Sequence, residues 1–213
     1  MHRESMSVPS MMDGISILHE IRLDHVLRCI RATGGRRILD LGCGSGLLLD
    51  RLATEKQFED IVGLENCPRA LARARQLLAE HPDAPFPHLK LVNGSYAEAQ
   101  PALRNYDVAV MVETIEHVKP GLLSAVEHSV FGQMRPRVVY LTTPNREYNP
   151  LFGLSPDQFR EPDHKFEWDR AKFAQWVYGV SRRNGYRVQL SGIGEEDPEL
   201  GPPTQTAFFS LGG

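Results

Sequence analysis

The amino-acid sequence predicts an α/β fold with a doubly wound, mostly parallel sheet. Short apolar runs that suit buried strands alternate with amphipathic helical segments across residues 37–142, which is the pattern of a parallel sheet with crossover helices. A glycine-rich turn at residues 42–46 joins one strand directly to a helix, as in α/β proteins that bind nucleotides. Two last strand-like runs, at 186–190 and 204–211, predict a C-terminal hairpin with a long polar connection.

The composition suits a single domain. The chain has 213 residues, enough for one sizeable core, and its net charge of −3 lacks the strong positive field of proteins that bind long nucleic acid. A short polymer end or a small molecule remains a possible ligand. Three cysteines without CxxC spacing suit free thiols in a reducing compartment. Because no apolar run approaches about 20 residues and the start lacks a signal-like core, we expect a cytoplasmic protein without a membrane partner.

The first half of the chain predicts an opening helix and two strand–helix units. Residues 1–14 are polar and are expected to be flexible. The predicted elements are helix 15–30, strand 37–41, helix 47–52, strand 60–65 and helix 68–80. Gly34 and Gly35 end the first helix, and Pro68 opens the last one, a position that tolerates proline.

The second half predicts three more parallel strands and the hairpin. Its predicted elements before the hairpin are strands 89–92, 106–112 and 137–142, a helix at 122–130 and a helix that follows Asp169. Asp169 is a suitable N-cap, and Gly185 a suitable C-terminal stop. Between the fifth strand and Asp169, the sequence predicts a long loop without obvious regular structure, which follows residues 143–145 and runs to about residue 167. Loops of that length in compact domains are usually functional or disordered, and the polar and aromatic content of this one favours function.

The glycine turn is the first candidate binding site. A strand that runs through glycines into a helix lets the backbone approach a ligand closely. Asp40 precedes the turn, and the second strand ends in Glu65, an acid that suits the two hydroxyls of a ribose. Nicotinamide dehydrogenases would need a third glycine where Leu47 stands, so hydride transfer is disfavoured.

The segment ETIEH at residues 113–117 is the second candidate site. It follows the apolar run 106–112, and ligands of open α/β sheets bind beyond the carboxyl ends of the strands. If the chain turns helical there, at least two of Glu113, Glu116 and His117 can converge on one point. Such carboxylate and imidazole donors suit a cation, although a solvated turn after a strand would use the same residue types.

The first half resembles the class I S-adenosylmethionine-dependent methyltransferases. DLGCGSG at residues 40–46 is similar to their cofactor loop, and Glu65 stands where their ribose-binding acid stands. Ser95 matches the position after the third strand that lies near the adenine. The resemblance therefore implies a single-domain, Rossmann-like fold that binds S-adenosylmethionine. The cofactor-binding residues that it implies are Asp40, Gly42, Cys43, Gly44, Glu65 and Ser95.

Three segments of the second half narrow the resemblance. ETIEH, TPNREYN (143–149) and DHKFEW (163–168) together resemble the small-RNA 3′-terminal 2′-O-methyltransferases, a family with plant and animal small-RNA enzymes and bacterial RNA-repair relatives. The tail at 194–206 is most similar to the bacterial branch. The match implies that the catalytic residues are the ligands of one divalent ion, Mg²⁺ or Mn²⁺, namely Glu113, Glu116, His117 and His164. The imidazoles favour Mn²⁺.

The resemblance implies a reaction and a substrate. A methyl group would pass from S-adenosylmethionine to the 2′-OH of the 3′-terminal nucleotide of RNA, on an end with free 2′-OH and 3′-OH, in small-RNA maturation or RNA repair. An RNA-repair or RNA-binding partner could supply further RNA affinity. The predicted division is a flexible N-terminus at 1–14 and a methyltransferase domain at 15–213. Two alternatives stay open: a small-molecule O-methyltransferase, and a non-catalytic protein that binds S-adenosylmethionine.

Overall fold

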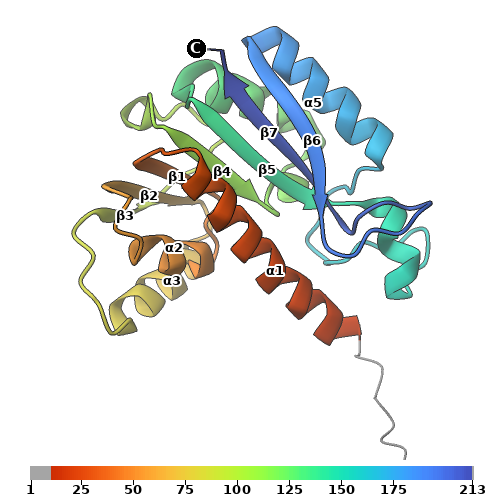
Figure 1. Ribbon diagram of the computed structural model, residues 1–213, viewed down its shortest axis with the longest axis horizontal. Helices are drawn as coiled ribbons and strands as arrows, with labels where there is room; N and C mark the ends of the chain where they lie inside the picture. Colours follow the sequence, from red (N-terminus) through yellow and green to blue (C-terminus); the bar gives the residue numbers. More distant parts are fainter. Residues whose placement is uncertain (1–10, 213) are drawn as a thin grey trace, which may run out of the picture.

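The computed structural model describes residues 11–212 of the chain. The strands of this part are β1 (Arg37–Leu41), β2 (Asp60–Glu65), β3 (Leu89–Asn93), β4 (Val108–Val112), β5 (Val138–Pro144), β6 (Tyr186–Ile193) and β7 (Thr204–Leu211). They form one sheet of seven strands in the order β3-β2-β1-β4-β5-β7-β6. The first five strands run parallel, and β7 is antiparallel to both β5 and β6. The predicted doubly wound sheet with a C-terminal hairpin is confirmed (Figure 1).

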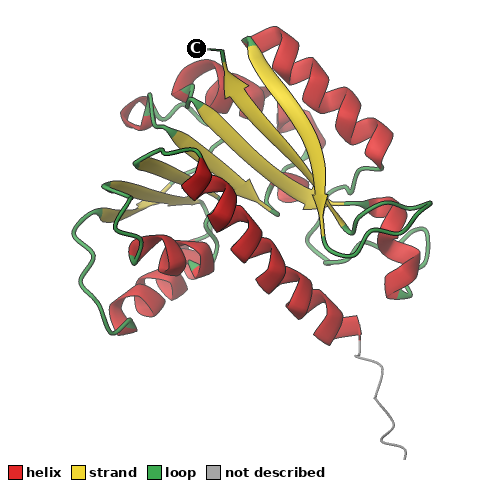
Figure 2. Ribbon diagram, viewed as in Figure 1, coloured by secondary structure: helices red, strands yellow, loops and turns green. Residues whose placement is uncertain are grey.

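Helices cover both faces of the sheet (Figure 2). They are α1 (Met11–Ala32), α2 (Leu47–Ala53), α3 (Pro68–Glu80), α4 (Leu123–Val126) and α5 (Arg170–Asn184), with 3₁₀ turns η1 (Pro101–Leu103), η2 (Ile115–His117), η3 (Pro120–Leu122) and η5 (Arg146–Phe152), and a π-helix η4 (Glu127–Met134). None of the helices within residues 11–212 has the length and apolar character needed to cross a membrane.

Alternation along the strands divides the interior into two apolar cores. In β1, Leu39 and Leu41 face the core that contains Phe131 of η4 and Phe173 of α5. Ile38 points the other way, into the core beneath α1, α2 and α3. Successive side chains of a strand point to opposite faces of the sheet, and those of β1 are buried on both faces. This is typical of a central strand in a parallel sheet with helices on both sides.

Several element boundaries differ from the sequence prediction. The opening helix begins at Met11, before the predicted start at residue 15, so residues 11–14 are helical and the flexibility predicted for 1–10 concerns residues outside the described part. The helix predicted at 122–130 continues to Met134 as a π-helix, which Arg135 ends in a left-handed conformation with φ +48°. The long loop predicted after residue 145, to about residue 167, contains the short helix η5, so it was wrong to expect no regular structure there.

The last strand of the sheet is tied to the long connection after β5. The side-chain amide of Gln205 in β7 donates to the carbonyl oxygens of Pro144 (3.0 Å) and Trp168 (2.9 Å). The hydroxyl of Thr204 accepts hydrogen bonds from Arg22 of α1 (3.1 and 3.4 Å). Helix α1 and strand β7, which lie near the two ends of the described chain, therefore meet at the carboxyl edge of the sheet.

Candidate functional site

The glycine turn after β1 has a backbone that glycine accommodates best. Gly42, Gly44 and Gly46 have φ values of +83°, +55° and +89°, in the region that L side chains rarely adopt. A Cβ at Gly42 would lie only 2.2 Å from the Thr114 hydroxyl oxygen. Glycine at this position therefore lets the turn pass directly against the segment that follows β4.

Glu65 fastens the turn to the end of β2. Its Oε2 accepts a hydrogen bond from the Gly44 amide at 2.9 Å, and its Oε1 accepts one from the Cys67 amide at 2.7 Å. Both carboxylate oxygens thus already accept hydrogen bonds from N–H donors, and the side chain lies at the edge of the turn. A carboxylate in this position can accept hydrogen bonds from the hydroxyls of a bound ribose.

A cavity of about 540 Å³ opens beside the turn, within the range of cofactor pockets. Its lining includes four of the predicted cofactor residues, Gly42, Gly44, Glu65 and Ser95. Glu113, Thr114 and His117 line the same cavity. The cofactor turn and the segment after β4 therefore share one hollow.

The other two predicted cofactor residues are buried and do not line this cavity. Asp40 has an Oδ2 that finds no hydrogen-bond partner among residues 11–212. Burial, with a smaller contribution from the charge of Glu65, raises the pKa of Asp40 to about 7. Burial likewise raises the pKa of the Cys43 thiol. Cys43 is therefore an inert small side chain inside the turn.

The second half of the site brings three predicted metal ligands together. Glu116, His117 and His164 each offer a donor atom, and these atoms all lie within 4.8 Å of one another. Glu116 and His117 come from the η2 turn, whereas His164 comes from the long connection after β5. The backbone amide of Lys165 donates to the Glu116 carbonyl at 2.8 Å, which holds the two segments side by side.

Glu116 is the most deeply buried of the three predicted ligands. Its side chain is fully buried, and Oε2 accepts a hydrogen bond from the Thr143 hydroxyl at 3.0 Å. Within the described part of the chain, Oε1 has no partner. Burial, and next the nearby charge of Glu113, raise the pKa of Glu116 well above its usual value. A buried carboxylate oxygen without a donor is destabilising, and a cation shared with two imidazoles would satisfy it.

Both imidazoles have one nitrogen engaged by a carboxylate. His164 Nδ1 lies 2.6 Å from Glu167 Oε1, and His117 Nδ1 lies 3.0 Å from Asp163 Oδ2. The two rings meet edge to face with centroids 4.8 Å apart. Burial lowers the pKa of His117, which favours the neutral form that metal ions bind. Nε2 is therefore the ring nitrogen of each histidine that would bind a ligand.

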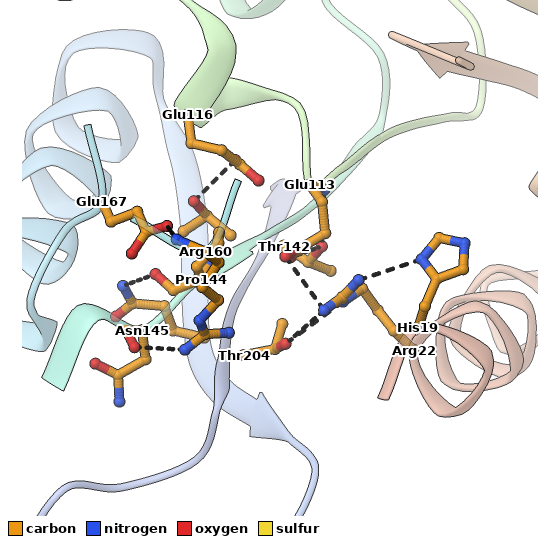
Figure 3. A network of polar contacts seen from close by, with 12 residues as sticks. His19, Arg22, Glu113, Glu116, Thr142, Pro144, Asn145, Arg160, Glu167 and Thr204 are labelled. Carbon is orange, nitrogen blue, oxygen red and sulfur yellow. Dashed lines mark hydrogen bonds and ion pairs between the residues drawn. The ribbon is translucent and has the colours of Figure 1, made fainter. Parts of the chain in front are cut away.

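Glu113, the fourth predicted ligand, is held apart from this group. Its backbone has φ +48°, and η2 begins only at Ile115, so the single helical turn that would align Glu113 with His117 does not form. The carboxylate instead lies 3.2 Å from Arg22 Nη2 and accepts a hydrogen bond from the Thr142 hydroxyl at 2.9 Å (Figure 3). Arg22 also approaches His19 and Thr204 in the same network.

Comparison with known proteins places this arrangement among methyltransferases. A family model described as "Methyltransferase domain" matches residues 39–136. The solved methyltransferase domain of bacterial CtHen1 is 35% identical and has a TM-score of 0.81, with 91% of this chain and 100% of that chain covered. The chain belongs to the Hen1 methyltransferase family. The resemblance seen in the sequence motifs is confirmed, and the fold is that of S-adenosylmethionine-dependent methyltransferases.

Curated relatives of the Hen1 family are longer than this chain. The small RNA 2′-O-methyltransferase of Arabidopsis thaliana is 31% identical over 90% of this chain, which spans 22% of that protein. The protein of the same description from Gallus gallus is 34% identical over 88% of this chain, and half of its length is covered. The solved small RNA methyltransferase HEN1 has a TM-score of 0.86 at 29% identity, with 100% of this chain and 27% of that chain covered.

Three residues of this Hen1-family site were missed by sequence reasoning. Glu167 contacts His164, and Asp163 contacts His117. Both lie in the DHKFEW segment. Glu167, three residues after His164, is a usable signal, whereas Asp163 is adjacent to His164 but contacts His117 of another segment. Arg22, which holds Glu113, gives no such signal, because it is an ordinary basic residue in an amphipathic helix distant in sequence from its partner.

Proposed function

We propose that this chain transfers a methyl group from S-adenosylmethionine to the 2′-OH of the 3′-terminal nucleotide of RNA, with the help of one divalent ion. The observation that carries the proposal is the meeting of two half-sites at one cavity. The glycine turn and Glu65 form one wall, and His117 lies on another wall. A carboxylate oxygen of Glu116, whose Oε1 has no partner among residues 11–212, lies within 4.8 Å of donor atoms of His117 and His164.

Four residues are proposed to bind the methyl donor directly. Gly42 and Gly44 allow the backbone to approach it, Glu65 accepts hydrogen bonds from its ribose hydroxyls, and Ser95 lies near its adenine. Asp40 and Cys43 shape the turn from behind, since both are buried away from the cavity. S-adenosylmethionine, when bound, supplies the methyl group.

Glu116, His117 and His164 are proposed to hold Mg²⁺ or Mn²⁺. Their mixed oxygen and nitrogen donors favour Mn²⁺. The ion, when bound, supplies Lewis acidity that polarises a hydroxyl group and eases the loss of its proton. Glu113 would complete the ligand set only by leaving Arg22 and Thr142, which hold its carboxylate at 3.2 and 2.9 Å.

The proposed substrate is an RNA end that carries both a 2′-OH and a 3′-OH. The 2′-OH distinguishes RNA from DNA. Lys119 lines the cavity together with the apolar side chain of Leu122, and both are exposed, so a terminal nucleotide meets a cationic and an apolar contact there. Because the chain has a net charge of −3, we propose that an RNA-repair or RNA-binding partner supplies the remaining affinity, in small-RNA maturation or RNA repair.

The test is single-turnover methylation with labelled S-adenosylmethionine and Mn²⁺. Matched oligonucleotides would end in ribose, 3′-deoxyribose or a 3′-phosphate, and a DNA of the same sequence serves as the control that lacks the 2′-OH. Label should appear on the terminal ribose of the first oligonucleotide, with little on the others. Equal rates on all three RNA ends would contradict recognition of the terminal diol.

A further inference from the structure

We propose that Glu167 is a positioning residue that fixes the tautomer and the orientation of His164, so that His164 Nε2 faces Glu116. The inference rests on the proposed metal-dependent function and adds a residue that holds a ligand rather than binding the ion. It concerns the DHKFEW segment, in which Glu167 follows His164 by one helical turn's spacing without a helix.

The contact between the two side chains is short and protected. His164 Nδ1 lies 2.6 Å from Glu167 Oε1, and the side chains are 4% and 0% exposed. A carboxylate oxygen only accepts hydrogen bonds when ionised, so it requires the N–H on Nδ1. The lone pair of the imidazole is then on Nε2. A carboxylate behind a histidine in this way sets the ring orientation and increases its strength as a ligand.

Both oxygens of the Glu167 carboxylate accept further hydrogen bonds, which fix its position. Its Oε1 also accepts from the Arg160 backbone amide at 2.7 Å, and its Oε2 accepts from the Asn149 side-chain amide at 2.6 Å. The Arg160 guanidinium in turn donates to the Asn145 carbonyl at 2.6 Å (Figure 3). It also donates to the Asn149 side-chain oxygen at 2.7 Å. These contacts join η5 to the segment that carries His164, and Glu167 accepts two of them.

The other imidazole has a weaker version of the same support. Asp163 Oδ2 lies 3.0 Å from His117 Nδ1, but the Asp163 side chain is 69% exposed. Water screens such a contact and competes for it. Removal of the Asp163 charge should therefore affect metal binding less than removal of the Glu167 charge does.

Glu167 also cross-links its own loop, so the experiment must separate positioning from folding. The variant Glu167→Gln keeps the size of the side chain and removes its charge. The control is Glu147→Gln in the same connection, whose carboxylate pairs with Arg170 at the surface. Mn²⁺ affinity is measured by electron paramagnetic resonance of the free ion, and S-adenosylmethionine affinity by calorimetry on the same samples.

We expect Glu167→Gln to weaken Mn²⁺ binding by about 10- to 100-fold, with unchanged affinity for S-adenosylmethionine. Asp163→Asn should weaken it only a few-fold, and Glu147→Gln should leave it unchanged. Mn²⁺ affinity of a folded Glu167→Gln protein within about twofold of the unaltered protein would overturn the role of Glu167 alone. If the unaltered protein fails to bind Mn²⁺, the metal assignment itself is overturned, and the role of Glu167 with it.

A second measurement needs no variant at that position. Long-range ¹H–¹⁵N correlation spectra of the metal-free protein report which ring nitrogen of each histidine carries the proton, and His164→Gln assigns the signals. The proposal predicts the Nδ1–H tautomer for His164. An Nε2–H tautomer would overturn it, whatever the stability of the Glu167 variant.

Discussion

The two halves of the site differ in how far the protein alone satisfies their key carboxylates. On the cofactor side, both oxygens of Glu65 accept backbone hydrogen bonds from neighbouring turns. On the metal side, the buried Oε1 of Glu116 finds no partner in residues 11–212. The cofactor side is built from strand ends close in sequence, whereas the metal side gathers η2 and a distant loop. The protein alone satisfies Glu65, although Asp40 behind the same turn keeps an oxygen without a partner among residues 11–212. On the other side, the proposed cation would satisfy Glu116.

The largest expected effect comes from Glu116→Gln on the metal side. Loss of the charged ligand should lower methyl transfer by about 1,000-fold, because polarisation by a metal ion contributes several kcal/mol. Affinity for S-adenosylmethionine should stay unchanged, since Glu65 and the glycine turn are untouched. Single-turnover rates and calorimetry test the two expectations together. Turnover at the unaltered rate would remove Glu116 from the metal site.

The complementary change on the cofactor side is Gly44→Val. Gly44 has φ +55°, and a Cβ there meets no atom of the described residues within 4 Å, so the added side chain would occupy space left for the cofactor. We expect affinity for S-adenosylmethionine to fall by about 100-fold, or about 2.7 kcal/mol, with Mn²⁺ affinity preserved. Calorimetry that finds normal cofactor binding would contradict the assignment of the turn.

The buried acid behind the turn predicts a pH dependence of stability. The pKa of Asp40 is raised to about 7 in the folded protein, so the folded state holds a proton that the unfolded state releases at lower pH. This contribution to stability is fully present below the usual aspartate range and is lost as pH rises through 7. Asp40→Asn should flatten the decline by about 2 kcal/mol between pH 5 and pH 7, as measured by urea denaturation. An unchanged slope would show that Asp40 ionises normally.

The smallest expected effect on ligand binding tests the network around Glu113. Arg22→Met removes the guanidinium that holds the Glu113 carboxylate, so Glu113 becomes free to reach the ion and a nearby positive charge disappears. Mn²⁺ affinity should rise a few-fold, while the free energy of unfolding should fall by about 3 kcal/mol because a buried ion pair is broken. Arg28→Met, on the exposed side of α1, is the control. Weaker Mn²⁺ binding would mean that Arg22 supports Glu113 as a ligand instead of competing for it.

The difference between local and long-range contacts also explains which features the sequence alone could predict. The bounds of β1, β2 and α3 agree with the structure, because apolar period, glycine turn and proline start are local signals. The helix η5 and the π-helix η4 were not predicted, since short or irregular helices depend on tertiary contacts. The position of His164 beside Glu116 followed from family resemblance and not from spacing. The Arg22–Glu113 pair had no sequence signal, because it joins residues far apart in the chain.

The hydrogen bonds from β7 indicate the order in which the two halves of the site form during synthesis. Gln205 donates to the carbonyl oxygens of Pro144 and Trp168, and the Thr204 hydroxyl accepts from Arg22. The last strand of the described residues therefore contacts both the long connection after β5 and the arginine that holds Glu113. Strands β1, β2 and β3, which carry the cofactor half, emerge much earlier. Contacts between segments so distant in sequence are the slow ones in folding. During synthesis the glycine turn would therefore form before β7 inserts between β5 and β6 and completes the proposed metal site.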